Sequence, residues 1–501
     1  MKKILLFLTV LLTFLSCDDK SGSSADRQFW VADDTKDYYS SSAGWYQVPA
    51  NLVYEGKHCE IYLEDDQDIS ESIIDNIASA FDNRIYDVVT NNFSTPTDID
   101  TNKKVILLLL DIKDGYSGPG DGYIGGYFAP WDLFSESELA MLGFPSHYKS
   151  NECEILYIDI NPADPTSEEI KSTIAHEFQH LVNMSQNVIY EDGYQMPTWI
   201  DEGFSMAAET IYQNVDLLEE REAWYDADPF FTGAIEGIPQ DLSMSIAAGH
   251  PLVAWANDES VYNNYALSHL FFAWLRIHML AKGDDDTFFK EIMADKDNTL
   301  DTVVEVCSSA IGTDINTNAK IIQRFYMANF LGGNGKTTGI ESYLGKNRHE
   351  GPFTLTSEYN LQFPLLPGAA IHISDSAVNG WVPSGGDEEV IYALGDISSE
   401  TADYIGTGGF GTGDNTQECL IVLNSLDEYT GEDSIKLTAP LPDSHITLNS
   451  VSGDNYLVLS DSPSNWSKLS KHRATTVEDL PKGTLRRGLE PKGDSTSRFR
   501  N

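Results

Sequence analysis

Apolar residues recur at helical spacing over residues 69–89, which predicts an amphipathic helix. The preceding residues 46–63 alternate in a way that is typical of strands. Residues 104–110 are largely aliphatic, which favours a buried strand, and residues 154–160 favour another strand. We expect residues 154–160 or 123–128 to lie near a sheet edge, where an extended peptide could add as a further strand. The helical positions are Ile73, Ile77, Phe81, Ile85 and Val88.

A second helix is predicted to begin near residue 170. Thr166 and Glu169 have the spacing of a capping box. Five apolar positions then fall on one arc of the helix, and Thr173, His176, Glu177 and His180 fall on the other. The pattern therefore predicts a core face and a separate face lining a cleft. The apolar positions are Ile170, Ile174, Phe178, Leu181 and Val182.

The polar arc carries the motif H-E-x-x-H, from His176 to His180. Residues four apart on a helix lie about 40° apart around its axis, so both imidazoles can reach one ion. Glu177 lies beside that ion, where a base must stand to take a proton from a water molecule on the metal. A lone histidine on a helix is usually structural, but here the motif sits on a capped amphipathic helix.

A third metal ligand should follow later in the chain, because catalytic zinc takes three protein ligands and leaves the fourth position to water. Residues 197–205 contain the candidate, Glu202. Thr198 and Asp201 form a possible capping pair that would place Glu202 in the first turn of another helix. Glu209 lies seven residues further on, hence on the same face, and could orient a ligand histidine.

The segments HEFQHLVN and PTWIDEGFSMAAE together resemble the glutamate-liganded zinc peptidases, the gluzincins. Within that clan the chain is most similar to the hyicolysin family of bacterial extracellular metallopeptidases. The resemblance implies one catalytic zinc ion on His176, His180 and Glu202, with Glu177 as general base in peptide-bond hydrolysis. It is strong over residues 104–214, weaker over the rest of 46–345, and absent beyond.

The predicted fold class is α+β. Residues 46–345 should form a zincin-like metallopeptidase domain with a mixed sheet and active-site helices. From about residue 349 short strands alternate with Gly, Pro, Asn and Asp turns, which favours a β-sandwich-like module over residues 346–465. Residues 466–501 read as a disordered basic tail. The expected strands of the module are residues 353–355, 370–373, 389–394, 419–424 and 457–459.

Residues 260–280 are long, aromatic and helical in period. Tyr262, Tyr265 and His269 lie near one face of this helix. In gluzincins a Tyr or His on a later helix donates a hydrogen bond to the tetrahedral oxyanion, and Tyr265 is the candidate for that role. An aromatic stripe is more often core packing. Five later histidines have no ligand spacing and are expected to be ordinary: His250, His269, His278, His349 and His372.

The first residues resemble an export signal. Lys2 and Lys3 precede an apolar run that is too short to span a bilayer, so residues 1–16 are predicted to be a signal peptide. Cys17 follows a small residue, as at a bacterial lipoprotein cleavage site, although Phe14 stands where Leu is usual. The alternative is an ordinary secretory signal. We expect an exported cell-envelope lipoprotein at the outer membrane or cell surface, otherwise a secreted protein, with residues 17–45 as a flexible tether.

The strongly negative net charge of the chain limits the partners that it can bind. The chain has 32 basic and 78 acidic residues and a formal net charge of −46. Such a surface repels nucleic acid and anionic lipid head groups. A solvated acidic surface is favoured over calcium sites, since no segment matches D-x-[DN]-x-[DN]-G, so Ca²⁺ is possible but unsupported by a motif. Four cysteines, Cys59, Cys153, Cys307 and Cys419, could pair in an oxidising compartment, but their spacings choose no pairing.

These observations predict a zinc-dependent endopeptidase acting on extracytoplasmic proteins, with protein or peptide substrates and a membrane contact through lipidated Cys17. Two alternatives stay open. One is a non-catalytic, lipid-anchored binding or adhesion protein that retains a zinc-binding fold. The other is zinc-dependent hydrolysis of a different amide, such as one in a cell wall.

Overall fold

The computed structural model describes residues 26–36, 38, 41–118, 123–141, 144–191, 196–226, 246, 248–253, 261–295, 298–346, 368–374, 390–405 and 419–424. The predicted signal peptide, Cys17, the strands 353–355 and 457–459, and the basic tail lie outside these residues.

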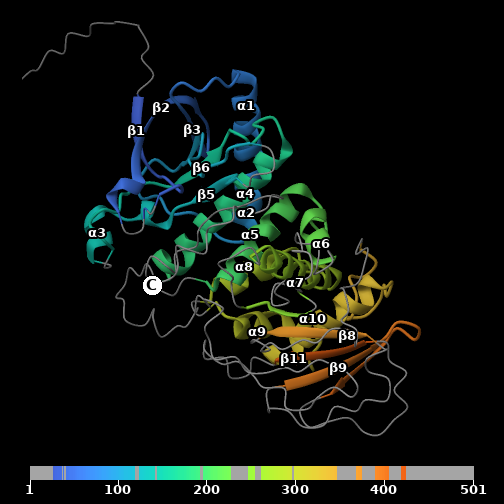
Figure 1. The fold of residues 1–501 in the computed structure, drawn as a ribbon. Helices are drawn as coiled ribbons and strands as arrows, with labels where there is room; N and C mark the ends of the chain where they lie inside the picture. The colour runs from blue at the N-terminus through green and yellow to red at the C-terminus, as the bar shows by residue number, and fades with distance from the viewer. Residues whose placement is uncertain are drawn as a thin grey trace, which may run out of the picture.

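A six-stranded mixed sheet forms one end of the molecule (Figure 1). Its order is β1-β2-β3-β4-β6-β5, with β3, β4 and β6 parallel and the other neighbours antiparallel. Every residue of β4 is buried, as the continuous apolar run predicts for a central parallel strand. The strands are β1 (Asp26–Ala32), β2 (Trp45–Glu55), β3 (Cys59–Glu64), β4 (Val105–Leu110), β5 (Gly126–Phe128) and β6 (Ile155–Asp159).

The short strand β5 ends this sheet, which agrees with the expectation that residues 123–128 lie at an edge. Its three residues are nevertheless all buried, so the outer edge of β5 is covered rather than open.

The structure corrects the predicted tether, because part of residues 17–45 belongs to the sheet. β1 pairs antiparallel with β2 from Asp26 opposite Asn51 to Ala32 opposite Trp45. Phe29 and Val31 are buried, and Trp30 N donates to Asn151 Oδ1 at 2.8 Å. The polar residues around this short apolar run concealed a strand that is stabilised by partners far along the chain.

The predicted helix at residues 69–89 is present but is built from three pieces. α1 (Glu71–Ala80) passes through one π-helical stretch, η2 (Phe81–Ile85), into α2 (Tyr86–Asn92). The longer α4 (Glu168–Met184) packs against β5, β6 and α2 and continues into a second π-helical stretch, η4 (Ser185–Tyr190). Shorter elements are η1 (Ser42–Gly44), η3 (Pro130–Leu133) and α3 (Glu136–Met141).

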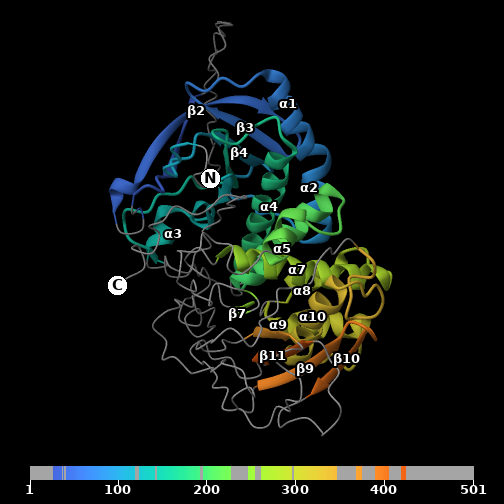
Figure 2. The same ribbon diagram turned by 45° about the vertical axis from the view of Figure 1, so that its right-hand side comes forward.

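A helical region follows, as expected, and lies beside the first sheet (Figure 2). α5 packs on both α4 and α7, which places it between the sheet layer and the later helices. None of the helices in the described ranges is long and apolar enough to cross a bilayer. The helices are α5 (Thr198–Gln213), α6 (Glu219–Asp226), α7 (Val261–Ala281), α8 (Thr287–Met293), α9 (Leu300–Ile311) and α10 (Asn318–Gly333).

A second, five-stranded antiparallel sheet lies at the opposite end (Figure 1). Its order is β10-β9-β11-β8-β7. Three strands coincide with those expected at residues 370–373, 389–394 and 419–424, whereas β10 was not predicted. The strands are β7 (Ala248–Pro251), β8 (Ala369–Ser374), β9 (Val390–Asp396), β10 (Thr401–Ile405) and β11 (Cys419–Asn424).

This second sheet packs on α10. Tyr326 of α10 donates to Gly368 O at 2.8 Å, and the Arg324 guanidinium lies 3.2 Å from the centre of the Tyr404 ring. β7 joins the sheet from within residues 46–345, so the boundary expected at 345/346 does not separate the two regions. The described strands form one layer against a helix, and a sandwich with a second facing sheet stays a prediction.

Three of the four cysteines are buried and carry free thiols: Cys59, Cys153 and Cys307. Cys153 Sγ accepts a 3.4 Å hydrogen bond from Arg27 Nη2. These three side chains therefore pack in the core without a disulfide.

Candidate metal centre

Helix α4 begins one residue later than the capping-box pattern predicts. Ser167 is the N-cap, and its Oγ accepts from Ile170 N at 3.3 Å. Thr166 instead donates its hydroxyl to Asp164 Oδ1 at 2.7 Å. A local partner two residues away thus takes the threonine side chain, and the neighbouring serine caps the helix.

The expected open face of α4 is also corrected. All residues from Ile170 to Met184 are buried, including both histidines of the motif. The first sheet covers one side of the helix and α5 packs along another. The polar arc therefore faces a second helix, and its polar groups must be satisfied by side chains from that helix.

Helix α5 begins at Thr198 with Pro197 as its N-cap, so the predicted Thr198–Asp201 capping pair does not form. Backbone groups do the capping instead, with Pro197 O accepting from Ile200 N at 2.9 Å and from Asp201 N at 3.0 Å. Glu202 therefore lies just beyond the first turn. The Asp201 carboxylate is left available for contacts with α4.

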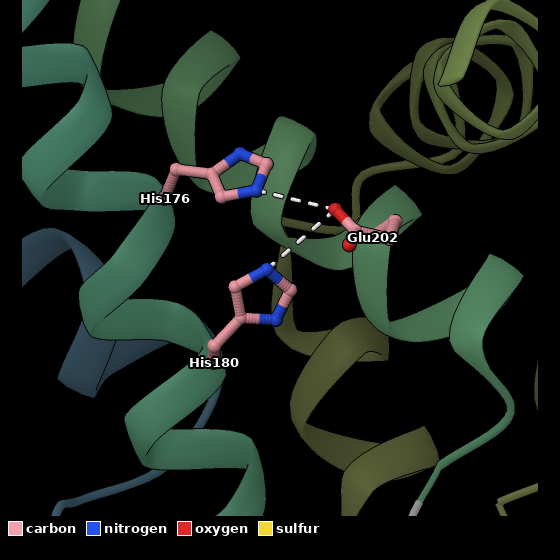
Figure 3. A group of neighbouring side chains, drawn as sticks. All are labelled: His176, His180 and Glu202. Carbon is pink, nitrogen blue, oxygen red and sulfur yellow. Dashed lines mark ion pairs between the residues drawn. The ribbon is translucent and has the colours of Figure 1, made fainter. Parts of the chain in front are cut away.

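Packing of α5 on α4 brings Glu202 between the two histidines of the motif (Figure 3). Glu202 Oε2 lies 3.3 Å from His176 Nε2 and 3.5 Å from His180 Nε2. One donor atom from each residue lies within 4.8 Å of the others, so this group could hold a metal ion. The residues that the sequence selected as ligands are thus brought together, and their role as ligands stays a prediction.

The spacing of these atoms fits zinc. Zinc bonds of about 2.0–2.2 Å at tetrahedral angles place ligand atoms about 3.4 Å apart. The two distances to Glu202 Oε2 agree with that value. His176 Nε2, His180 Nε2 and Glu202 Oε2 are also buried without a hydrogen-bond partner. Buried polar atoms are rarely left unsatisfied, and one cation would satisfy all three.

The other ring nitrogen of each histidine is held by α5. His176 Nδ1 lies 2.8 Å from Glu209 Oε1, as the seven-residue spacing suggested. His180 Nδ1 lies 3.0 Å from Asp201 Oδ1 and 3.1 Å from Ser205 Oγ. These contacts fix each ring so that Nε2 faces Glu202. The roles of Asp201 and Ser205 were missed, because the sequence presented Asp201 only as a capping residue.

The pKa values of His180 and Glu202 show that the negative charge of this site favours a bound positive charge. Burial pushes the pKa of His180 down, but the Asp201 and Glu202 carboxylates outweigh burial and the pKa ends well above its usual value. Burial raises the pKa of Glu202, yet His180 and His176 outweigh it and the pKa falls to about 2. Carboxylates therefore outnumber imidazoles here, and either protons or a cation must balance them.

Glu177 lies on the same helix but is held differently. Its Oε2 accepts from Phe128 N of strand β5 at 3.0 Å, whereas its buried Oε1 has no hydrogen-bond partner. Burial raises the pKa of Glu177 to about 7, and the Glu202 carboxylate adds to the rise. One oxygen is thus anchored and the other is available to hold a proton. The contact with Phe128 was not visible in the sequence.

Gly203 allows α7 to approach the centre closely. A Cβ at this position would lie 2.2 Å from Phe272 Cδ2. The Phe272 ring also stacks on Trp199 at 5.7 Å and contacts Phe204 edge-on at 5.1 Å. The glycine after Glu202 is therefore explained by packing between α5 and α7.

The later aromatic helix has a clear packing role. Tyr265 is buried, and the Arg221 guanidinium lies 5.1 Å from its ring centre. His269 Nε2 accepts from Leu218 N at 3.0 Å, and burial with nearby Arg221 lowers its pKa to about 3. His278 Nε2 lies 2.9 Å from Ser342 O. His269 and His278 are thus structural, as expected, and the oxyanion role of Tyr265 stays a prediction.

The site combines two histidines and a glutamate from adjacent helices with a second glutamate, of which only one carboxylate oxygen is held by a hydrogen bond. This is the arrangement of a metallohydrolase site. Comparison with known proteins places the chain in a family of bacterial metalloproteases. It is 32% identical over 332 residues to neutral metalloprotease ShpI of Staphylococcus hyicus, an alignment that covers 63% of this chain and 68% of that protein. No protein-family model matches the chain.

Proposed function

We propose that this protein is a zinc-dependent endopeptidase of the gluzincin type, close to the hyicolysins. The observation that carries the proposal is the convergence of three buried donor atoms without hydrogen-bond partners, beside the available Oε1 of Glu177. Similarity to ShpI, whose name describes a neutral metalloprotease, supports peptide bonds as the substrate.

His176, His180 and Glu202 would hold the zinc ion, with Glu209, Asp201 and Ser205 orienting the two imidazoles. Bound there, zinc would supply a Lewis acid that acidifies water and polarises a carbonyl group. The protein's own contribution is a rigid, buried set of donors whose geometry requires little rearrangement on binding.

Glu177 is the general base of the proposed reaction. The Phe128 N–H fixes its Oε2, so Oε1 is the atom that would accept a proton from the attacking water. The same atom would then pass that proton to the leaving amine, which completes the transfer without another side chain. Burial raises the pKa of this carboxyl, and the positive charge of a bound zinc ion would oppose that rise, so the carboxylate that accepts the proton would be present at neutral pH.

The decisive experiment compares the purified protein with its Glu177→Gln variant. The amide keeps the size of the side chain and the Phe128 contact but cannot accept the proton. We expect one zinc ion per chain in both proteins and casein hydrolysis only in the parent. The loss should be about 10²–10⁴-fold, the usual contribution of a general base, and a zinc chelator should abolish the parent's activity.

Other outcomes would redirect the proposal. Zinc in both proteins without hydrolysis of casein or any peptide would favour the non-catalytic binding protein. Hydrolysis of cell-wall amides alone would favour the other alternative, zinc-dependent hydrolysis of an amide other than a peptide bond. Full activity in Glu177→Gln would remove the assigned base, and absence of zinc would remove the metal centre.

We further propose that the protein is exported and lipidated at Cys17. The Lys-rich start, the short apolar run and the position of Cys17 support this proposal. Radiolabelled palmitate should be incorporated into the parent and lost in Cys17→Ala, with the protein released from the membrane fraction. Equal labelling of both proteins would refute lipidation at Cys17. A soluble, unlabelled parent would favour the ordinary secretory signal.

A further inference from the structure

We propose that the loop between α2 and β4 forms a second metal site, which binds Ca²⁺ through Asp98, Asp100 and Glu154. One carboxylate oxygen from each residue lies within 4.8 Å of the other two. Ca²⁺ binds oxygen at 2.3–2.6 Å, so oxygens on opposite sides of one ion lie about 4.6–5.2 Å apart. The three carboxylates are therefore close enough to share a single calcium ion.

Glu154 provides the independent sign of a ligand. Its side chain is buried, with only 1% of the residue exposed, immediately before β6. Oε1 accepts from Ile99 N at 2.8 Å, whereas Oε2 is buried without a hydrogen-bond partner. A buried carboxylate oxygen beside two further carboxylates is costly unless a cation offsets it.

Within the described ranges no lysine or arginine nitrogen forms an ion pair with Asp98, Asp100 or Glu154. Burial raises the pKa of Asp100 above its usual value and outweighs the Arg27 guanidinium, which favours the charged form. The nearby Lys104 is engaged elsewhere, at 2.6 Å from Glu55 and 3.7 Å from Glu60.

Backbone N–H groups of the loop hold two of the three carboxylates in place. Asp98 Oδ1 accepts from Lys103 N at 2.8 Å, and Asp100 Oδ1 accepts from Asn102 N at 3.1 Å. Asp98, Asp100 and Asn102 have the spacing of the first three ligands in the D-x-[DN]-x-[DN]-G calcium loop. Lys103, at φ +62°, occupies the position where that loop has glycine for its sharp turn. This departure explains why the sequence pattern was not recognised.

Glu154 replaces the glutamate that ends such a loop, and it comes from a different part of the chain. Oxygen ligands alone favour a hard cation, and three carboxylates favour Ca²⁺ over zinc. Ca²⁺ usually takes 6–8 oxygens, so backbone carbonyls or water would complete the shell. The Asn102 amide is already engaged, since its Oδ1 accepts from Lys104 N at 2.6 Å and its Nδ2 donates to Asp100 Oδ2 at 2.9 Å.

Calcium at this position would strengthen the support of α4. Residues near the loop already bind the π-helical stretch that continues α4. Thr97 N donates to Ser185 Oγ at 3.1 Å, and Tyr190 donates its hydroxyl to Pro96 O at 2.8 Å. The calcium loop thus joins the start of β6 to the end of the helix that carries His176 and His180. The proposed ion is structural and does not depend on the proposed peptidase reaction.

Calorimetric titration of the metal-stripped protein, reloaded with one equivalent of zinc, tests the site. We expect one Ca²⁺ per chain, with a dissociation constant on the order of 10⁻⁵–10⁻³ M. Asp100→Asn and Glu154→Gln should each weaken it about tenfold or more. Asp75→Asn, which removes the same charge from an exposed position on α1, should bind as the parent does.

Thermal unfolding separates a calcium ligand from a merely structural carboxylate. Calcium should raise the Tm of the parent and of Asp75→Asn, but not that of Glu154→Gln. In chelator, with free zinc held constant, Glu154→Gln should be as stable as the parent or more so, because carboxylate repulsion is relieved. A lower Tm for Glu154→Gln in both conditions would assign it a structural role and overturn the proposal. Equal calcium binding by all variants, no calcium binding, or an equal response to Mg²⁺ would also overturn it.

Discussion

Glu209 and His176 lie 33 positions apart in the sequence, yet Glu209 Oε1 is 2.8 Å from His176 Nδ1. This contact joins the C-terminal part of α5 to the middle of α4. It fixes the imidazole so that Nε2 faces Glu202, and it places a negative charge behind the proposed metal ligand. The two helices therefore supply both the donors and the groups that orient them.

Replacing Glu209 with Gln should weaken zinc binding about 10–100-fold, the usual effect of losing such an orienting carboxylate. The amide keeps the shape but no longer increases the basicity of the imidazole. Competition with a chromophoric chelator would measure the affinity. Glu305→Gln, a change of the same kind at an exposed position on α9, is the matched control. Equal affinities in the two variants would show that Glu209 does not support the metal.

The two contacts of His180 Nδ1 differ in strength. Asp201→Asn should weaken zinc binding more than Ser205→Ala, because a carboxylate is a stronger acceptor for an imidazole N–H than a hydroxyl. Chelator competition on each variant and on the double variant would measure both effects and their coupling. A larger effect of Ser205→Ala would mean that the hydroxyl is the principal partner of His180 Nδ1.

Gly203→Ala should destabilise the protein by about 1–3 kcal/mol, because the new Cβ would overlap the Phe272 ring. Denaturant unfolding would measure the loss. Introduced alone, Phe272→Leu should also destabilise the protein, but it makes room for the Cβ that Gly203→Ala adds. In the double variant the two losses should therefore be less than additive. Additive losses would show that the two side chains do not conflict.

The stability of the folded state should fall as the pH rises from about 4 to 7, in part because of Asp132. This residue has no exposed surface, and burial raises its pKa to about 7 although Tyr157 and Asn151 N donate to it, each at 2.6 Å. An unfolded aspartate has a pKa of about 3.9. Between these values the folded state binds more protons, so the free energy of unfolding falls as pH rises, by at most about 1.4 kcal/mol per pH unit.

Denaturant unfolding of the parent and of Asp132→Asn across this pH range would test the effect. Asp159, whose pKa burial also raises to about 7, contributes equally to both proteins. The difference between the two profiles therefore isolates Asp132. Identical slopes would show that Asp132 does not titrate in this window.

The sequence predicted those parts of the fold that depend on neighbours along the chain. The buried run at residues 104–110 became β4, the helix carrying the H-E-x-x-H motif became α4, and residues 419–424 became β11. The residues that cap the N-termini of α4 and α5 were harder to predict. Ser167 rather than Thr166 caps α4, because the Thr166 hydroxyl donates to Asp164 instead. Pro197 rather than Thr198 is the N-cap of α5, and only its backbone carbonyl takes part. The strand β1 was missed because β2 supplies its hydrogen bonds and distant residues bury it.

By itself, the sequence determined the pair of histidines four residues apart and the glutamate beside them, because periodicity along one helix brings these groups close together. It also indicated the later Glu202, through the segment at residues 197–205 and its resemblance to the gluzincins. Only the tertiary structure decided that Asp201 contacts His180, that Phe128 N anchors Glu177, and that Gly203 admits Phe272. It likewise brought Glu154 to the loop of Asp98 and Asp100. These contacts join segments that are distant in the chain, and only the packing of helices and strands determines which of them meet.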